Sequence, residues 1–235
     1  MVRLFKQKYQ YTKYTQKQTA KPWINNNNKD IVRVTGRGLY TILPVDKPKF
    51  NLNLYDVLKQ SYAWNPDLSK YGFSIDKTLS NSNFQTYFND SDKQLLFVIK
   101  GTNILNPFDI MTDVYLAAGK LKDTYRLQEA ARYLQSAKRK YTPNQTVVAG
   151  HSLGGAIAQY IASGSDKVLT LDKGATLNQP TRQNETAYRT EGDIVSMLAT
   201  GTTTLKNKSK LPYIPLFSEY NAHDINNIKD SNITF

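Results

Sequence analysis

Hydrophobic positions recur with a regular spacing only beyond about residue 50, and there they predict distinct helices and strands. In residues 53–64 the apolar side chains lie mostly at helical spacing, which predicts an amphipathic helix. Residues 71–80 and 83–90 are rich in β-branched and aromatic side chains and favour two strands. Residues 94–99 follow without polar alternation, as expected for a strand that is buried on both faces.

Helical and strand-like segments alternate through the second half of the chain. Residues 123–141 place apolar side chains mostly along one face, with an aspartate at the start and basic residues near the end, which suits a helix dipole. A short apolar strand at 145–150 then runs into a small-residue helix at 151–164, and 167–180 and 186–196 resemble two further strands. Such alternation is typical of a parallel sheet with crossover helices. We therefore predict an α/β fold with a mostly parallel central sheet, an N-terminal helix, an antiparallel hairpin and flanking helices.

The composition narrows the chemistry that this chain can carry. Its 235 residues are 40% hydrophobic and 11% aromatic, which is typical of a globular protein with a sizeable core. The chain has no cysteine, which excludes disulfides, zinc-thiolate sites, iron–sulfur clusters and thiol nucleophiles. The presence of only two histidines argues against a histidine-based metal cluster, and we expect neither a metal nor a cofactor.

Basic residues are concentrated in the first part of the chain. The formal net charge is +12; residues 1–50 contain 11 lysines and arginines against two aspartates, whereas residues 51–235 contain 20 basic and 17 acidic residues. We interpret 1–50 as a basic, flexible arm and linker, with a run of asparagines at 25–28, and 51–235 as a single folded domain. The charge of the arm suits an anionic membrane or lipid surface, and nucleic acid is the alternative partner.

The sequence shows no targeting signal of the usual kinds. No segment has the length and apolarity of a signal peptide or a membrane span, and the longest apolar block covers only residues 95–99. An intracellular or virion-associated location is therefore favoured over export by the usual route.

A candidate nucleophile lies between two of the predicted elements. Residues 150–154 read Gly-His-Ser-Leu-Gly and match the pattern G-x-S-x-G, at the point where the strand 145–150 turns into the small-residue helix. Gly150 and Gly154 would relieve the crowding of such a sharp turn, and Ser152 would stand at the carboxyl edge of the sheet near the positive end of a helix dipole. The alternative is a glycine-rich turn with an incidental serine.

A serine hydroxyl needs a base, and the base needs a carboxylate that orients it. His151 lies inside the turn, where its side chain is expected to point away from the site, so His223 is the candidate base. Asp193 and Asp172 each follow a predicted strand, and both are candidates for the acid. We favour Asp193 because serine, aspartate, histidine is the chain order of the α/β-hydrolases.

Stabilisation of a tetrahedral oxyanion requires hydrogen-bond donors beside the nucleophile. The backbone N–H of Leu153, directly after Ser152, is one candidate. Thr102 is the other, because it follows the strand 94–99 through Gly101 and offers both a backbone N–H and a hydroxyl. From spacing alone, a simple strand-ending turn accounts equally well for Gly101 and Thr102.

Around these residues the sequence resembles the class 3 lipases, the fungal-type triacylglycerol lipase family. VVAGHSLGGAIA is similar to the nucleophile region of that family, IKGT to its oxyanion segment F-R-G-T, and EGDIVSML to the region of its catalytic aspartate. The resemblance covers about residues 50–225 and implies an α/β-hydrolase fold. It implies the same catalytic and oxyanion roles for the residues named above, which are Ser152, Asp193, His223, Thr102 and Leu153. The chain departs from the family pattern at Lys100, where an arginine is usual, and at Ile110, where a tryptophan is usual.

Two apolar stretches lie outside these motifs. The first contains Leu105, Phe108, Ile110 and Met111, which could form a lid that opens onto lipid or an ordinary helix packed on the sheet. The second, residues 211–217, is a candidate wall of an acyl pocket.

Together these features predict a serine carboxylic-ester hydrolase of the lipase or phospholipase type, which cleaves fatty-acyl esters of lipids through an acyl-enzyme on Ser152. Triacylglycerol, phospholipid and feruloyl-type esters are all candidate substrates. Two other interpretations stay open. One is a catalytically silent, lipase-like binding or structural protein; the other is a virion- or nucleic-acid-associated protein whose basic arm is the main functional element.

Overall fold

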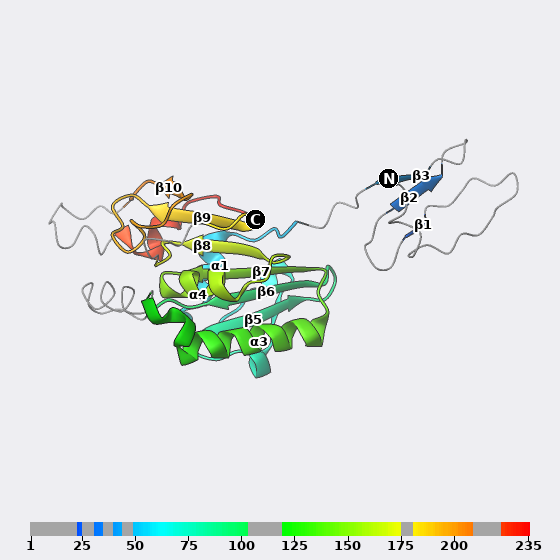
Figure 1. Cartoon of the computed structure of the whole chain (residues 1–235), viewed down its shortest axis with the longest axis horizontal. Helices are drawn as coiled ribbons and strands as arrows, with labels where there is room; N and C mark the ends of the chain where they lie inside the picture. Colours follow the sequence, from blue (N-terminus) through cyan, green and yellow to red (C-terminus); the bar gives the residue numbers. More distant parts are fainter. Residues whose placement is uncertain are drawn as a thin grey trace, which may run out of the picture. The chain divides into compact units, whose positions relative to one another are not determined.

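The chain forms two compact units, Met1–Lys47 and Pro48–Phe235, and each is described by itself (Figure 1). The computed structural model describes residues 23–24, 31–34, 40–43, 49–102, 119–174, 181–208 and 222–235. Among these residues, none of the helices combines the length and the apolarity that crossing a bilayer requires.

The first unit contains a small antiparallel sheet in the order β1-β2-β3. Its strands are β1 (Trp23–Ile24), β2 (Ile31–Val34) and β3 (Tyr40–Leu43), and Val32 pairs with Ile42 across the second ladder. The sequence pattern did not predict these strands, because segments of two to four residues are too short to show an alternating period. The flexibility of residues 1–50 stays a prediction.

The second unit is built on a seven-stranded sheet in the order β10-β9-β8-β7-β6-β5-β4. The strands from β6 to β10 are parallel to their neighbours, while β4 and β5 add an antiparallel edge. Their bounds are β4 Ser74–Ile75, β5 Phe84–Asn89, β6 Gln94–Ile99, β7 Gln145–His151, β8 Lys167–Leu171, β9 Glu185–Thr190 and β10 Thr203–Leu205. The predicted α/β fold with a mostly parallel sheet and an antiparallel hairpin is confirmed, and only the three-residue strand β10 was not foreseen.

Three α-helices flank this sheet in the described part of the chain: α1 (Leu54–Gln60), α3 (Tyr125–Tyr141) and α4 (Leu153–Ile161). The Asn53 side chain accepts a hydrogen bond from the Asp56 N–H and so begins α1, while Thr124 caps α3 in the same way. Short 3₁₀ turns complete the unit at η1 (Ser69–Tyr71), η2 (Lys77–Leu79), η3 (Leu121–Asp123) and η4 (Ile225–Ile228).

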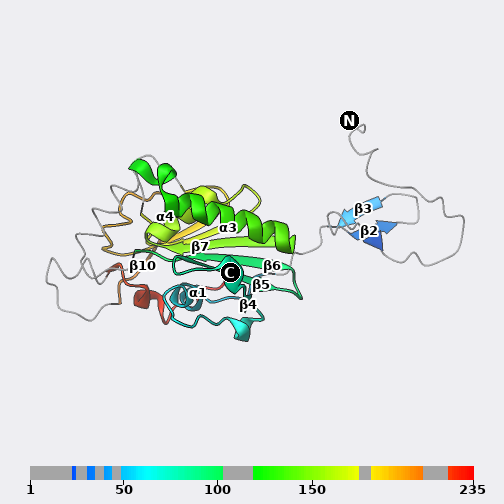
Figure 2. The same cartoon turned by 90° about the horizontal axis from the view of Figure 1, so that it is seen from below.

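The helices cover opposite faces of the sheet, with α1 on one side and α3 and α4 on the other (Figure 2). Successive side chains of β6 explain the arrangement: Leu96 and Val98 pack with α1, while Leu95, Phe97 and Ile99 pack with α3 and α4. Each fully buried leucine or phenylalanine contributes roughly 1.5–3 kcal/mol. Burial on both faces is the physical reason that residues 94–99 show no polar alternation.

The parallel register brings the carboxyl ends of the five strands from β6 to β10 to one edge of the sheet. Ile99 of β6 pairs with Gly150 of β7, and His151 pairs with Leu171 of β8. The residues that follow these strands therefore meet at this edge, although they lie far apart in the sequence. This carboxyl edge is where ligands of open α/β sheets bind.

Candidate active site

Ser152 lies in a strained turn between β7 and α4. Its backbone has φ +56° and ψ −128°, a conformation that non-glycine residues rarely adopt and that costs of order 1–3 kcal/mol. The side chain is fully buried. A strained strand-to-helix turn of this kind holds the nucleophile of α/β-hydrolases at the edge of the sheet.

Gly150 and Gly154 allow the strand and the helix to meet this closely. A Cβ atom on Gly154 would lie 2.2 Å from the carbonyl oxygen of Ile99, and one on Gly150 would lie 2.3 Å from the carbonyl oxygen of Gly154. Both distances are far inside contact with rigid backbone atoms, so neither position tolerates a side chain without displacing the turn.

His223 and Asp193 are hydrogen-bonded to each other at the same edge. The Nδ1–H of His223 donates to Oδ1 of Asp193 at 2.9 Å, and both side chains are buried. The carboxylate also accepts hydrogen bonds from the backbone N–H groups of Val195, at 3.3 Å, and Ser196, at 2.9 Å, and from the Ser196 hydroxyl. These contacts fix the carboxylate and leave Nε2 as the ring nitrogen of His223 that has no partner among the described residues.

The electrostatics of this pair favour its ionised carboxylate. Burial alone would raise the pKa of Asp193, but the hydrogen bond and the charge of His223, together with the Ser196 donors, lower it below its ordinary value. Burial likewise disfavours the imidazolium of His223, yet Asp193 outweighs this effect and raises the pKa of His223 above 6.5.

Asp172, the rival carboxylate, is engaged elsewhere. It follows β8 with φ +46° and accepts hydrogen bonds from the backbone N–H of Thr190 at 2.5 Å and from its hydroxyl at 2.9 Å. Burial, reinforced by the negative charge of Asp193, raises the pKa of Asp172 to about 7. No hydrogen bond joins Asp172 to His223 in the described part of the chain, so the structure pairs His223 with Asp193.

Three polar side-chain atoms at this edge lack a hydrogen-bond partner among the described residues: Oγ of Ser152, Nε2 of His223 and Oγ1 of Thr102. All three are buried, and buried polar atoms in folded proteins are normally paired, so a group of unpaired ones is informative. Ser152 and His223 are not hydrogen-bonded to each other in this structure. Such contacts are often long in ligand-free enzymes and tighten only when substrate binds.

The two candidate oxyanion donors flank Ser152 from different elements. Leu153 is the first residue of α4, so its N–H belongs to the groups that a helix leaves without an internal partner at its positive end. Thr102 follows β6 within residues 100–102, which we call the oxyanion loop.

Two residues that sequence analysis did not single out hold the oxyanion loop. Arg126 of α3 donates from Nη2 to the carbonyl oxygen of Lys100 and, at 3.4 Å, to that of Gly101. The hydroxyl of Tyr62, just after α1, accepts the N–H of Gly101 at 3.1 Å. Neither residue carries a local signal, because each is one polar position at the end of an amphipathic helix.

His151 corrects one expectation. Its side chain was expected to point away from the site, but its ring packs against that of His223, with 4.7 Å between the ring centroids. Its Nε2 lies 3.0 Å from the carbonyl oxygen of His223, and its Nδ1 lies 2.8 Å from the hydroxyl of Tyr62. Burial, together with the nearby His223, lowers the pKa of His151 to about 3.

One cluster of the described residues has donor atoms close enough to share a cation. Ligand atoms of His151, Asp172 and His223 lie within 4.8 Å of one another. Both ring nitrogens of His151, Nδ1 of His223 and the Asp172 carboxylate already take part in hydrogen bonds. A cation at this place would have to break several of these contacts.

The remaining predicted site residues lie outside the described part of the chain. These are the lid candidates Leu105, Phe108, Ile110 and Met111 and the apolar stretch 211–217.

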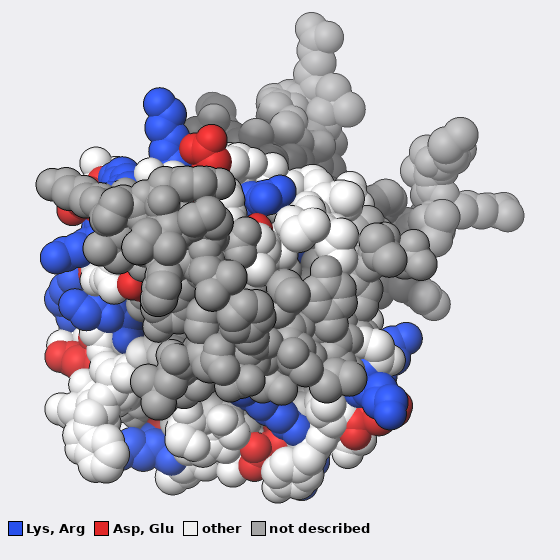
Figure 3. All heavy atoms as spheres, turned by 90° about the vertical axis from the view of Figure 1, so that its left-hand side faces the viewer, with Lys and Arg blue, Asp and Glu red and all other residues white. Residues whose placement is uncertain are grey.

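Seen from the side that Figure 3 faces, the described basic and acidic side chains are interspersed.

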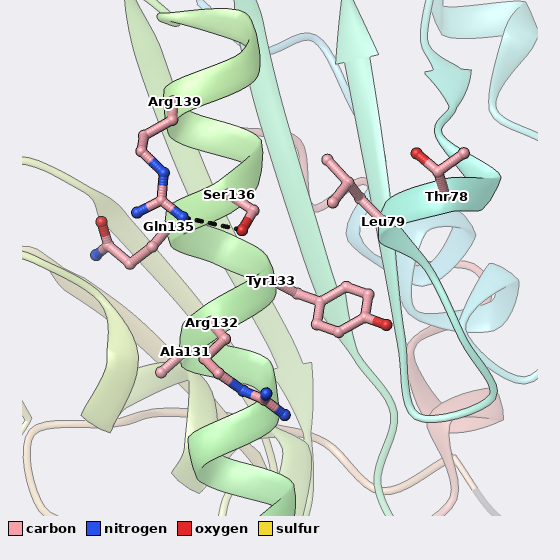
Figure 4. Close-up of a pocket in the computed structure, with 8 residues that line it drawn as sticks. All are labelled: Thr78, Leu79, Ala131, Arg132, Tyr133, Gln135, Ser136 and Arg139. Carbon is pink, nitrogen blue, oxygen red and sulfur yellow. Dashed lines mark hydrogen bonds between the residues drawn. The ribbon is translucent and has the colours of Figure 1, made fainter.

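A separate hollow lies on the outer side of the second unit. Its volume is about 580 Å³, and it lies beside α3 and η2, where the ring of Tyr133 points toward Leu79 (Figure 4). Its lining is Thr78, Leu79, Ala131, Arg132, Tyr133, Gln135, Ser136 and Arg139. None of these residues is among those at the carboxyl edge of the sheet that are described above.

The parallel sheet, the covering helices and the strained turn after β7 define the α/β-hydrolase fold. No protein-family profile and no curated protein sequence matches this chain. Solved structures of lipases match it distantly. A triacylglycerol lipase described as having a serine-protease triad at its catalytic centre shares 13% identity, covers 74% of this chain and 89% of its own, and has a TM-score of 0.44. A Rhizomucor miehei lipase–propeptide complex shares 14% identity over 74% of this chain and 75% of its own, with a TM-score of 0.45.

Proposed function

We propose that this protein is a serine carboxylic-ester hydrolase. Oγ of Ser152 attacks the acyl carbonyl carbon of the ester, and Nε2 of His223 takes the hydroxyl proton. Asp193 holds the imidazole in the required tautomer and stabilises the imidazolium that forms. The hydroxyl and N–H of Thr102 and the N–H of Leu153 stabilise the oxyanion.

The second half of the reaction uses the same groups. His223 returns its proton to the departing alcohol as the tetrahedral intermediate collapses to an acyl-enzyme on Ser152. Water then attacks the acyl carbonyl while His223 accepts a proton from it, and collapse of this second intermediate releases the carboxylic acid and restores the Ser152 hydroxyl. No redox step or external co-reactant other than water is needed.

One observation carries this proposal. Ser152, His223 and Thr102 each place a buried, unpaired polar atom at one edge of the sheet, and His223 is already oriented by a buried carboxylate at 2.9 Å. Nε of Arg126 and Nε of Arg189 are also buried and unpaired among the described residues. An unsatisfied buried group costs about 1–3 kcal/mol, so the grouping of a serine, a histidine and a threonine of this kind at one edge supports a site that pairs them with a ligand.

We further propose fatty-acyl esters of lipids as the substrate class. The support is the sequence resemblance to the class 3 lipases and the apolar stretches that follow the oxyanion loop and precede His223. Association of residues 1–50 with an anionic lipid surface or with nucleic acid stays a prediction.

The test is covalent labelling with a fluorophosphonate combined with turnover of a p-nitrophenyl butyrate ester. The intact chain is expected to be labelled and to hydrolyse the ester. Ser152→Ala should lose the label and about 10⁶-fold in kcat, because the nucleophile is removed. Ser165→Ala is the matched control: Ser165 is an exposed serine whose hydroxyl lies beside that of Ser163, so its loss should change neither readout.

An intact, folded chain that is neither labelled nor active would contradict the proposal. That result would instead favour the catalytically silent, lipase-like binding protein. Full activity in Ser152→Ala would show that another residue is the nucleophile.

A further inference from the structure

We infer that Tyr62 and His151 form a hydrogen-bonded chain that couples the oxyanion loop to the catalytic base, so that both are positioning residues for the ester hydrolysis. The inference rests on the proposed function for its catalytic meaning. The chain itself is a matter of geometry and can be tested without turnover.

Three contacts connect elements that are far apart in the sequence. The backbone N–H of Gly101 lies 3.1 Å from the Tyr62 hydroxyl oxygen. That oxygen lies 2.8 Å from Nδ1 of His151, across 89 positions of sequence. Nε2 of His151 then lies 3.0 Å from the carbonyl oxygen of His223, 72 positions further along. The path therefore runs from the oxyanion loop to the backbone of the proposed base.

The chemistry of the two ends fixes the direction of every hydrogen bond. The carbonyl oxygen of His223 can only accept, so Nε2 of His151 must carry a proton and donate it. A neutral His151 then has a bare Nδ1, which must accept from the Tyr62 hydroxyl. The N–H of Gly101 can only donate, and the Tyr62 oxygen accepts it. Each group thus has one role, and no member of the chain can be reversed alone.

The groups in this series of hydrogen bonds keep their protonation states at neutral pH. His151 faces His223, Asp193 and Asp172, and burial together with the nearby His223 lowers the pKa of His151 to about 3, so the ring stays neutral. Burial raises the pKa of Tyr62 to about 12, so its hydroxyl stays protonated. The chain therefore keeps one arrangement while His223 exchanges its proton during the reaction.

The same groups leave little freedom to the loop. Arg126 donates to the carbonyl oxygens of Lys100 and Gly101, and the Tyr62 hydroxyl accepts the N–H of Gly101. The peptide group between Lys100 and Gly101 is therefore held at both its carbonyl oxygen and its N–H. His151 stands in the position before Ser152 and contacts the backbone of His223. A shift of the base and a shift of the oxyanion donors are thereby resisted by one set of contacts.

The first experiment measures coupling by kinetics. Tyr62→Phe keeps the ring and removes the hydroxyl, and we expect kcat for p-nitrophenyl butyrate to fall about 10- to 100-fold with KM unchanged, because reacting groups are misplaced. In a Thr102→Ala background the same substitution should cost at least about threefold less, since the Thr102 hydroxyl, one of the two donors that the loop positions, is already lost. Tyr71→Phe is the matched control. Like Tyr62, Tyr71 has a lysine ammonium over its ring and donates a hydrogen bond from its hydroxyl, but the acceptor is Asp56 on α1. It should leave kcat and KM within about twofold.

The second experiment needs no activity. Because the chain has only two histidines, ¹⁵N-histidine labelling gives two imidazole spin systems, and His151→Gln removes one of them for assignment. We expect His151 to show the Nε2–H tautomer and no titration between pH 5 and 9. Tyr62→Phe should shift its Nδ1 resonance through loss of the hydrogen bond, and Tyr71→Phe should not.

The outcomes separate the two proposals. An intact chain without fluorophosphonate labelling or ester turnover would overturn the proposed function, and the tautomer measurement would then decide the hydrogen-bonded chain alone. A proton on Nδ1 of His151, or an unchanged Nδ1 resonance in Tyr62→Phe, would contradict the inferred series of hydrogen bonds from Gly101 to His223. Equal losses from Tyr62→Phe with and without the Thr102 hydroxyl would overturn the coupling to the oxyanion loop.

Discussion

Two buried pairs of an acidic and a basic side chain lie beside strands β8 and β9, and they differ in what their atoms leave unpaired. His223 and Asp193 are joined at 2.9 Å, and Lys173 and Glu185 at 2.6 Å, with all four side chains at most 4% exposed. Lys173 follows β8, Glu185 begins β9 and Asp193 follows β9, whereas His223 lies in the last part of the sequence, just before η4.

The Lys173–Glu185 pair is what we call the closed pair, because its carboxylate is surrounded by hydrogen-bond donors. Besides the lysine, the Glu185 carboxylate accepts hydrogen bonds from Thr170 at 3.0 Å, Gln159 at 2.7 Å and the N–H of Arg182 at 3.0 Å. Burial lowers the pKa of Lys173 even though Glu185 opposes the shift. These hydrogen bonds connect β8, β9 and α4.

In the His223–Asp193 pair, the open pair, only the aspartate has all of its hydrogen-bond partners among the described residues. Asp193 is fully engaged by His223, Val195 and Ser196, but Nε2 of His223 has no partner among the described residues. Ser152, in strained backbone, leaves its hydroxyl unpaired at the same edge. Burial and an oppositely charged partner are common to both pairs, whereas among the described residues the unpaired atoms of Ser152 and His223 lie only at the edge that holds Asp193.

The largest expected effect tests the open pair. Asp193→Asn should lower kcat about 10⁴-fold while the protein stays folded, because an amide stabilises neither the required tautomer nor the imidazolium. Ester turnover and circular dichroism measure the two quantities. Asp172→Asn is the control and should cost less than about tenfold, since Asp172 is bonded to Thr190. The reverse ranking of the two variants would assign the orienting carboxylate to Asp172.

The next effect tests the closed pair. Glu185→Gln leaves the buried Lys173 without a counter-charge and should lower the free energy of unfolding by about 3–5 kcal/mol. Activity per folded molecule should change only a few-fold, because Glu185 contacts none of the reacting groups. Denaturant unfolding and kcat on the folded fraction separate the two quantities.

An exposed pair provides the reference for that loss. Lys93 and Asp90 are joined at 2.5 Å, with side chains 48% and 86% exposed, and Asp90→Asn should cost about 0–1 kcal/mol. A loss of the same size in Glu185→Gln would mean that the buried pair does not hold the strands.

A last effect is the pH dependence of the His223–Asp193 pair. His223 acts as a base only when neutral, so kcat/KM should rise about tenfold per pH unit and reach half its plateau above pH 6.5, where Asp193 has raised the pKa of His223. A raised histidine pKa stabilises the folded chain below the unfolded value near 6.5, and this contribution is lost as the pH rises through the folded pKa. Activity and thermal midpoint should therefore move in opposite directions as the pH rises above 6.5. A half-point below 6.5 would contradict the pairing of His223 with Asp193.

Much of the fold could be predicted from local patterns. The unbroken apolar run at 94–99 and the helical spacing at 123–141 each report burial within one element, and β6 and α3 formed where these patterns lie. Shorter elements escaped, because β1 and β10 have two and three residues and cannot establish a period.

The sequence by itself determined the nucleophile turn and the scarcity of bases. Gly150, Ser152 and Gly154 are a local steric solution, and two histidines leave few alternatives. Only the tertiary structure joined His223 to Asp193 by a hydrogen bond, turned His151 toward His223 and brought Tyr62 to the oxyanion loop. These contacts join residues far apart in the sequence and depend on the register of parallel strands, which places the carboxyl ends of distant segments at one edge and which no local spacing encodes.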